Sequence, residues 1–330
     1  MPSVENNKLV WSQRKVLVTG GSGFLGSWLT LRLVQYGAEV VGIVRGDNQN
    51  SLLSISNTRQ KIRVEYGDLT DYRLVERVIN ERSIDTVFHL GAQAIVKKGR
   101  KAPYQTFESN IRGTYTLLDA CRVHKDQVKR ILVASSDKAY GYSPLLPYKE
   151  DMPLSGVDPY EVSKSCTDLV ANSYAKTYGL PIVILRCGNI FGGGDLNWDR
   201  IVPGAMRALI LGEILEIRSS DDFVRDYIYV EDVVDAYLYA SQYLDYAKTP
   251  NTAFNISQGN PITVSELLNR IRLETNRPLE IKARPDCDGE LREQFLDSEL
   301  ARSELGWVPR HALAEGITKT LAWYENFLLS

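Results

Sequence analysis

The stretch Val16-Leu-Val-Thr-Gly20-Gly-Ser-Gly23-Phe-Leu-Gly26 decides the fold, because it joins a short apolar run directly to a helix-like segment. Glycines at this spacing permit a tight turn, close approach of the backbone to a pyrophosphate, and close packing of a helix on a strand. The start of the helix adds amide donors and a favourable dipole for phosphate groups. The stretch therefore predicts a dinucleotide site that uses Gly20, Gly23, Phe24, Leu25 and Gly26.

Outward from this stretch, short apolar runs alternate with longer helix-like segments as far as about Arg186. The runs are rich in β-branched residues and apolar on both faces, as expected of parallel strands covered on both sides. They span Val16–Thr19, Val40–Val44, Arg63–Tyr66, Thr86–Leu90, Ile131–Ser135 and Ile182–Arg186. The helix-like segments are Leu25–Tyr36, Tyr72–Arg82, Tyr104–His124 and Pro159–Tyr178. This alternation predicts an α/β fold, a doubly wound parallel sheet of the Rossmann type.

The pattern changes after residue 186. Residues 187–199 are rich in Gly and Asn and predict a loop, and shorter helices follow. These helices are expected at Pro203–Leu211, Glu231–Tyr243, Val264–Glu274, Glu299–Leu305 and Ala314–Phe327. We therefore expect a dinucleotide-binding domain over residues 1–186 and a smaller C-terminal substrate-binding lobe over residues 187–330, with segments that return to the sheet. Residues 1–13 and 47–60 are expected to be mobile.

Composition argues against several classes of protein. The 330 residues include 39 Lys and Arg against 41 Asp and Glu, whereas nucleic-acid binders usually carry a basic excess. The basic run Lys97–Lys101 is interpreted as a solvated loop. No apolar run approaches the ~18 residues of a membrane helix, and no secretory signal is visible, so we expect a cytoplasmic protein. Four cysteines without a CxxC pair and three histidines predict neither a disulfide framework nor a metal site.

The end of the second predicted strand bears on the choice between NAD and NADP. A carboxylate is expected there when the cofactor has free ribose hydroxyls, but the sequence reads Val44-Arg45-Gly-Asp47. Arg45 therefore favours the 2′-phosphate of NADP. Two alternatives stay open: Asp47 in a bent loop could serve NAD, and Arg45 could be an ordinary surface arginine. Further cofactor contacts are predicted after the third and fourth strands, from Asp68, Leu69, Leu90, Gly91 and Ala92.

Polar residues suited to acid–base chemistry follow the fifth strand and open the next helix. Ser136 lies at the strand edge where doubly wound folds bind their ligands. Tyr160 and Lys164 are four residues apart on a predicted helix, so their side chains share one face. A phenol, with an ordinary pKa near ~10, becomes a useful base at neutral pH when an ammonium group lies beside it. We expect these three residues to act on an alcohol, with Tyr160 and Lys164 also binding the cofactor.

Taken together, these stretches resemble the extended short-chain dehydrogenase/reductase superfamily, specifically its nucleotide-sugar epimerase/dehydratase branch. The resemblance covers nearly the whole chain and implies an NAD(P)-dependent enzyme that acts on a nucleotide-diphosphate hexose. It rests on TGGSGFLG (19–26), GDL (67–69), HLGAQ (89–93), NIRGT (110–114), SSDKAYG (135–141), YEVSK (160–164), RCGNIFGGGD (186–195), RDYIYVEDV (225–233) and LGWVP (305–309).

The residues after Ser136 separate the members of this branch. Epimerases usually have small, inert residues there, whereas hexose 4,6-dehydratases have an acid and a second functional group, as Asp137 and Lys138 are here. This run and residues 188–200 resemble CDP-glucose 4,6-dehydratase most, whereas GIVR (42–45) looks more like GDP-mannose 4,6-dehydratase. The resemblance implies a 4,6-dehydratase; the alternatives are a 4-epimerase and a non-catalytic dinucleotide-sensing protein.

In the implied dehydratase, Asp137 protonates the departing O6, and Lys138 removes the C5 proton or stabilises the enolate. A structural ion pair between these two residues is the alternative. Substrate-binding residues are implied in the same way. Asn189 and Arg225 match phosphate-contacting residues of the branch, Arg200 is a weaker candidate, and Gln93 could reach the hexose.

The sequence also bears on assembly. The helices predicted over residues 104–124 and 159–178 carry apolar residues on more than one face, a pattern typical of helices that pack on a partner as well as on their own sheet. The branch usually dimerises through this helix pair, so the resemblance implies a homodimer. The nucleotide base and the stereochemistry of the sugar are left open by the sequence.

Overall fold

The computed structural model describes residues 9–217, 222–247, 252–283 and 290–329 of the chain. The chain forms two compact units. The first takes the residues up to 142 together with 150–186 and 234–254, and the second takes 143–149, 187–233 and the residues from 255 onward. The main part of the first unit thus ends at Arg186, and a later segment of the chain returns to it.

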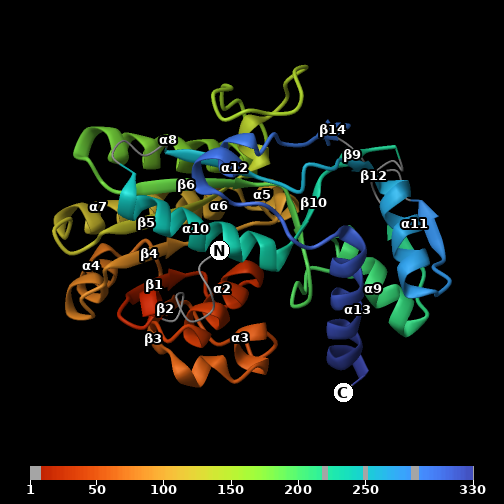
Figure 1. Cartoon of the computed structure of the whole chain (residues 1–330), viewed down its shortest axis with the longest axis horizontal. Helices are drawn as coiled ribbons and strands as arrows, with labels where there is room; N and C mark the ends of the chain where they lie inside the picture. The colour runs from red at the N-terminus through yellow and green to blue at the C-terminus, as the bar shows by residue number, and fades with distance from the viewer. Residues whose placement is uncertain (1–8, 218–221, 248–251, 284–289, 330) are drawn as a thin grey trace. The chain divides into compact units, whose positions relative to one another are not determined.

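A seven-stranded sheet runs through the first unit in the order β11-β6-β5-β4-β1-β2-β3. Figure 1 labels its strands from β6 to β3. Its strands are β1 (Lys15–Thr19), β2 (Glu39–Val44), β3 (Arg63–Tyr66), β4 (Thr86–His89), β5 (Arg130–Ser136), β6 (Ile182–Cys187) and β11 (Ala253–Ile256). The pairs from β3 to β5 are all parallel. The strand order reverses at β1, which has β4 on one side and β2 on the other. In doubly wound folds this reversal marks the ligand-binding edge, at the carboxyl ends of the strands.

Helices cover the sheet on both faces, so the predicted Rossmann-type fold is confirmed. The longer ones are α2 (Phe24–Gln35), α4 (Tyr72–Glu81), α7 (Gly113–Val123), α8 (Pro159–Tyr178) and α10 (Val230–Tyr246). The two faces can be followed on β4. Val87 belongs to the buried core that β1, β5 and β6 share with α4, α7 and α8. Its neighbour Phe88 points the other way, to the rings of Trp11 and Tyr237, at centroid distances of 6.0 and 6.3 Å.

Several of the described segments differ from the sequence prediction. Residues 47–60, expected to be mobile, form the short helices α3 (Leu52–Ile55) and η1 (Thr58–Lys61), because Leu52 and Leu53 are buried and Ser51 caps the first of them. The basic run expected to be a solvated loop is helix α5 (Val96–Lys101). The expected loop after residue 186 contains β7 (Asn189–Phe191), which pairs with β10 (Tyr227–Tyr229).

The single helix predicted over residues 104–124 is interrupted. It consists of α6 (Pro103–Phe107), a π-helical turn η2 (Glu108–Arg112) and α7. Inside the turn, the buried Asn110 donates its side-chain amide to Ser163 on α8 and to the carbonyl of Gln93, at 2.8 and 3.0 Å. Its own carbonyl accepts from the hydroxyls of Thr114 and Thr167. These contacts account for the wider turn, because they draw the Asn110 backbone and side chain toward neighbouring elements.

The described residues of the second unit form small sheets and four helices. Its strands are β7, β8 (Leu215–Ile217), β9 (Val224–Arg225), β10, β12 (Ile262–Thr263), β13 (Ile281–Ala283) and β14 (Glu293–Gln294), and its helices are α9 (Ile201–Leu211), α11 (Val264–Thr275), α12 (Glu299–Leu305) and α13 (Leu313–Leu329). The buried Asp232 accepts from the backbone N–H groups of Arg310 and His311, at 3.0 and 3.1 Å, and its carbonyl accepts from the Trp307 indole. Two distant motifs, RDYIYVEDV and LGWVP, therefore meet here.

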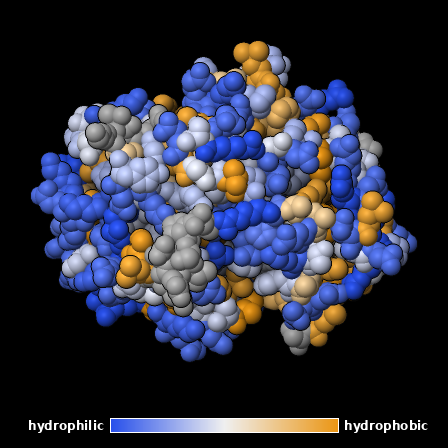
Figure 2. Space-filling view, in the orientation of Figure 1, coloured by the Kyte–Doolittle hydropathy of each residue, from blue (hydrophilic) through white to orange (hydrophobic). Residues whose placement is uncertain are grey.

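No helix in the described ranges has the length and apolar character needed to cross a membrane. Figure 2 shows one face of the molecule, on which apolar side chains lie in small groups among hydrophilic ones.

Candidate functional site

The glycine-rich turn brings the ends of β1 and β4 together. Gly20 has a φ of +70°, and a side chain there would lie 2.8 Å from the backbone of Leu90 and Gly91. A side chain on Gly26 would lie 2.1 Å from the carbonyl oxygen of Gly20. Only glycine fits these two positions, since real side-chain contacts of this kind do not fall below about 3 Å.

The start of α2 suits a phosphate group. Gly23 is its N-cap, no side chain caps the helix, and its first turn holds no acidic residue. The N–H groups of the first turn, which includes Phe24, Leu25 and Gly26, and the positive end of the helix dipole are what an anion requires. The turn and this helix start therefore fit the pyrophosphate of a nicotinamide dinucleotide.

Charged residues gather where β2 and β3 end. Arg45 is exposed directly after β2. Asp47 is bound by Arg59 and by the hydroxyl of Tyr66, the latter at 2.8 Å. Although burial would raise the pKa of Asp68, hydrogen bonds from the N–H and hydroxyl of Thr70 outweigh it and lower that pKa, with help from the positive charge of Arg45. The carboxylate that could serve NAD, on Asp47, is therefore already paired.

Small residues line the loops after β3 and β4. A side chain on Gly91 would lie 2.6 Å from Leu69 and 3.0 Å from the hydroxyl of Thr19, and the N–H of Gly91 donates to that hydroxyl at 3.0 Å. The structure therefore places Leu69, Leu90 and Gly91 beside the glycine-rich turn, with Ala92 the next residue along the chain.

A buried histidine that the sequence analysis left outside the site connects these loops to α7. His89 ends β4, and its two ring nitrogens lie 2.9 Å from the hydroxyls of Thr19 and Thr114. Burial, together with the charge of Lys164, lowers the pKa of His89 to about 3. The ring is therefore neutral at working pH, and it accepts one hydrogen bond and donates the other. The HLGAQ run (89–93), which contains His89, could have indicated that this histidine belongs to the site.

Ser136, Asp137 and Lys138 form the turn that follows β5. Ser136 is the N-cap of the 3₁₀-helix η3 (Asp137–Tyr140). Its hydroxyl donates to the Asp137 carboxylate at 2.8 Å and accepts from the N–H of Lys138 at 3.2 Å. Asp137 is only 3% exposed, whereas Lys138 is half-buried. The turn thus presents a hydroxyl, a buried carboxyl group and an amine from three consecutive residues.

Tyr160 and Lys164 lie in the first two turns of α8 and are both buried. Lys164 donates to the carbonyl of Ala134 in β5 at 2.8 Å, and Ser165 donates to the carbonyl of Ala139 in η3 at 2.8 Å. The structure therefore brings the predicted Ser136, Tyr160 and Lys164 set onto two elements that pack directly on each other.

Helix α5 makes a packing contact with Tyr160 that was not predicted from the sequence. Gly99 in α5 is so close to it that a side chain at position 99 would lie 3.3 Å from the Tyr160 Cβ atom. The next residue, Arg100, pairs with Asp158, the N-cap of α8, which also forms a capping box with Glu161. Helix α5 therefore covers the start of α8, and a lone glycine in a basic run carried no recognisable signal of this role.

The side chain of Gln93 is occupied within its own loop. Its amide nitrogen donates to the carbonyl of Ile95 at 2.9 Å and to Thr106 at 3.3 Å, and its amide oxygen accepts from the N–H of Ile95 at 2.6 Å. A contact from Gln93 to a hexose would require these bonds to break. Gln93 therefore shapes its loop in this structure, and its contact to a hexose stays a prediction.

The other predicted substrate residues lie in the second unit. Arg225 in β9 is 5% exposed, and its guanidinium donates to Glu290 at 2.9 Å and to the carbonyls of Val224, Leu291 and Arg292. Arg200, the N-cap of α9, pairs with Asp195 at 2.8 Å. The Asn189 backbone N–H donates to the carbonyl of Asp226, and its side-chain nitrogen is buried without a hydrogen-bond partner among the described residues.

Within the described residues there is no group of three or more His, Cys, Asp or Glu side chains that could hold a metal ion. Cys121, Cys166 and Cys187 are free thiols, and Cys287 lies outside the described residues. Burial raises the pKa of the Cys121 thiol, which makes it a poor nucleophile.

The chain matches the family model described as GDP-mannose 4,6 dehydratase over residues 17–320. It is 28% identical to CDP-glucose 4,6-dehydratase from Salmonella typhimurium, over 98% of this chain and 93% of that protein. It is 32% identical to UDP-glucose 4-epimerase from Mycolicibacterium smegmatis, over 94% of this chain and 99% of that protein. The chain is therefore similar in sequence both to a 4,6-dehydratase and to a 4-epimerase.

Solved structures of an epimerase and of a dehydratase are both similar to this chain. UDP-glucose 4-epimerase from Thermotoga maritima, solved with UDP-glucose, has a TM-score of 0.86 at 29% identity and covers 95% of this chain and 99% of its own. A dTDP-glucose 4,6-dehydratase from Streptomyces venezuelae, solved with NAD, has a TM-score of 0.84 at 26% identity and covers 94% and 97%. The fold, including the part after residue 186, is shared with both.

Proposed function

The chain belongs to the GDP-mannose 4,6-dehydratase family, and we propose that it converts a nucleotide-diphosphate hexose to the 4-keto-6-deoxy sugar. The observation that carries this proposal is Asp137, a carboxyl group 3% exposed and bonded to Ser136 directly after β5. Loss of water across C5 and C6 needs a proton for the departing hydroxyl group, whereas epimerisation at C4 needs none. A buried acid next to the serine suits the first reaction.

A nicotinamide dinucleotide is the proposed cofactor, as in the relatives solved with NAD. When bound, it would supply the hydride acceptor for oxidation of the sugar at C4 and the hydride donor for reduction at C6. Gly20, Gly23, Phe24, Leu25 and Gly26 would hold the pyrophosphate, and Asp68, Leu69, Leu90, Gly91 and Ala92 would line the rest.

We propose NADP as the preferred form. Arg45 is exposed directly after β2, and the nearby carboxylate of Asp47 is paired with Arg59 of η1. A 2′-phosphate beside Arg45 would therefore meet a positive charge. Extraction of the cofactor from purified protein, followed by mass analysis, tests this. Recovery of NAD alone would contradict it.

The residues on α8 and η3 would supply the proton transfers. The Tyr160 phenolate, stabilised by the Lys164 ammonium, takes the proton of the O4 hydroxyl and becomes a neutral phenol, and Ser136 orients the alcohol by a hydrogen bond. Asp137 then donates a proton to the departing O6. Lys138 removes the C5 proton or stabilises the enolate that forms.

In the second unit, Arg225 and Asn189 are the proposed ligands of the diphosphate, with Arg200 as a weaker candidate. Arg225 already binds one carboxylate, that of Glu290, whose side chain is 43% exposed. A phosphate would replace that carboxylate at the Arg225 Nη2 atom, since both anions accept charge-assisted hydrogen bonds from a guanidinium.

A 4-epimerase is the second candidate, because the epimerase from Mycolicibacterium smegmatis shares 32% identity with this chain. In that reaction the 4-keto sugar rotates and takes its hydride back on the other face of C4. Incubation with CDP-, UDP-, GDP- and dTDP-hexoses separates the two. A dehydratase product is lighter by one water, and an epimer has the mass of its substrate.

We expect Asp137→Asn to abolish water loss in a dehydratase; an unchanged rate would contradict the role of Asp137.

We further propose a homodimer formed by the helices over residues 104–124 and 159–178. Large apolar side chains are exposed on them: Tyr104, Tyr115, Val123, Leu169 and Tyr178. Such exposure is typical of a face that packs on a partner. Light scattering tests this: we expect a dimer mass for the wild-type protein and a monomer mass for Leu169→Glu, and a wild-type monomer at micromolar concentration would contradict it.

A further inference from the structure

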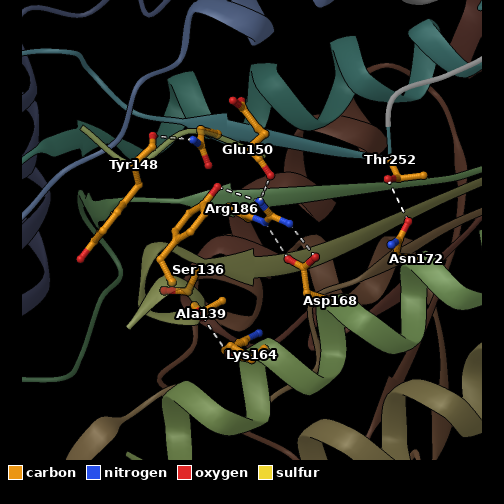
Figure 3. A network of polar contacts seen from close by, with 12 residues as sticks. Ser136, Ala139, Tyr148, Glu150, Lys164, Asp168, Asn172, Arg186 and Thr252 are labelled. Carbon is orange, nitrogen blue, oxygen red and sulfur yellow. Dashed lines mark hydrogen bonds and ion pairs between the residues drawn. The ribbon is translucent and has the colours of Figure 1, made fainter. Parts of the chain in front are cut away.

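A buried arginine connects the two elements that carry the candidate catalytic residues (Figure 3). Arg186 lies near the end of β6, which neighbours β5 in the sheet. Its Nε and Nη2 atoms donate to the two carboxylate oxygens of Asp168 at 2.8 and 2.9 Å. Its Nη1 atom donates to the hydroxyl of Tyr140 at 2.7 Å and to the carbonyl of Glu150 at 2.9 Å. Four hydrogen bonds thus fix the guanidinium in one orientation.

The two side chains that Arg186 holds are each one helical turn from a candidate catalytic residue. Tyr140 is three residues after Asp137 in η3, and a 3₁₀-helix has about three residues per turn. Asp168 is four residues after Lys164 in α8, so the two share a helix face. The guanidinium therefore contacts both the turn that carries Asp137 and the helix that carries Lys164.

Stability alone does not explain this arrangement. Asp168, Arg186 and Tyr140 are 2%, 6% and 1% exposed, and burying a charged pair costs desolvation that well-packed apolar residues would avoid. Although burial alone would lower the pKa of Arg186, its bonds to Asp168 raise that pKa, so the guanidinium stays charged at all working pH values. The bidentate pair with Asp168 and the bond to the Tyr140 hydroxyl together give α8 and η3 a defined geometry about one guanidinium.

The end of the same turn is also fixed. Gly141 has a φ of +63°, and a side chain there would lie 2.1 Å from the carbonyl oxygen of Ser155. The N–H of Ser155 donates to the carbonyl of Tyr140 at 3.2 Å. Since the turn is held at Gly141 and at Tyr140, its relation to α8 depends on the Arg186 contacts together with the hydrogen bond from the Ser165 hydroxyl to the carbonyl of Ala139.

We propose that Arg186 is a positioning residue: by binding Tyr140 and Asp168 at once, it sets the Ser136–Asp137–Lys138 turn against Tyr160 and Lys164. This inference rests on the proposed function. It deepens that function by naming a residue that acts only through others. Because misplacement of reacting groups by about 1 Å can cost 10²-fold in rate, a partial loosening should lower kcat by roughly tenfold and leave KM unchanged.

Tyr140→Phe is the mildest test, since it removes one hydroxyl and keeps the ring. Arg186→Met is the stronger one, and the matched control is Arg130→Met. Arg130 is as buried as Arg186, with side chains 8% and 7% exposed. It begins β5, at the end of the strand away from Ser136, and is paired with Asp245. We measure kcat, KM, melting temperature and bound cofactor for each variant against the hexose that the wild-type enzyme turns over.

The expected result is a kcat lower by roughly tenfold for Tyr140→Phe, and lower still for Arg186→Met, with KM within about twofold of wild type. Arg130→Met should lower the melting temperature without this loss of kcat. The proposal is overturned if Tyr140→Phe keeps wild-type kcat, if KM alone rises, or if Arg130→Met loses as much kcat as Arg186→Met. Should Arg186→Met not fold, Tyr140→Phe decides alone.

Failure of the proposed function would look different. If the wild-type enzyme yields an epimer, the dehydratase proposal fails. The same variants would still test Arg186, because both reactions begin with removal of the O4 proton by Tyr160.

Discussion

The protonation of His89 gives a prediction whose size follows from the structure. The ring is 3% exposed and lies between the hydroxyls of Thr19 and Thr114, and burial lowers its pKa to about 3. In the unfolded chain the histidine pKa returns to about 6.5. The unfolded state therefore binds this proton more readily than the folded state. The stability that the neutral ring contributes is complete above pH ~6.5 and is lost as the pH falls toward 3.

The magnitude between pH 7 and pH 5 does not depend on the folded value, provided that value lies well below 5. Integration over this range gives a loss of about 2 kcal/mol in the free energy of unfolding from this one side chain. His89→Asn should lack this loss, because asparagine does not titrate yet still offers one donor and one acceptor to the two threonines.

Urea unfolding of both proteins at pH 7, 6 and 5 measures the effect, and the difference between wild type and variant removes the contributions of other titrating groups. We expect the gap between the two curves to change by about 2 kcal/mol between pH 7 and pH 5. Parallel pH dependences would refute the argument that the buried ring stays neutral. Because Thr19 also binds the N–H of Gly91, bound dinucleotide should be lost on acidification earlier in wild type than in His89→Asn.

Three further substitutions test other parts of the structure. Gly26→Ala would place a methyl group 2.1 Å from a backbone carbonyl oxygen. It should therefore abolish cofactor retention and destabilise by roughly 1–3 kcal/mol, whereas Gly46→Ala, which meets nothing within 4 Å, should do neither. Gly99→Ala should displace Tyr160 by a few tenths of an ångström and lower kcat by about threefold without loss of cofactor, as steady-state kinetics would show. Thr263→Ala removes the capping box of α11 and should cost about 1 kcal/mol in thermal or urea unfolding, with kcat unchanged.

The strands and long helices of the first unit could be predicted because their burial is periodic. A strand covered on both faces carries an unbroken apolar run, as β1 does over residues 16–18 and β6 over residues 182–185, and a helix that ends at a glycine shows its boundary, as α8 does at Gly179. The glycine-rich turn was equally readable, since positions 20 and 26 leave no room for a side chain. These features depend on residues close together in the sequence.

Other features depend on contacts between distant residues and left no local pattern. The π-helical turn η2 exists because Asn110 reaches Gln93 and Ser163, which lie on other elements. The helix α3 was missed because its apolar part is only two leucines long, and α5 because its sequence is mostly basic. Short elements of this kind are stabilised by what they pack against, which propensity does not report.

The same distinction applies to the candidate active site. The types of residue that perform chemistry were readable as short motifs, SDK at 136–138 and YEVSK at 160–164. Their relative placement is set by residues outside those motifs: Gly99 against Tyr160, the carbonyl of Ala134 at Lys164, and Arg186 between η3 and α8. None of these three is expected to touch the substrate. Substitutions at Gly99 and Arg186 should therefore change kcat far more than KM, a signature that separates the residues that place the machinery from those that bind the sugar.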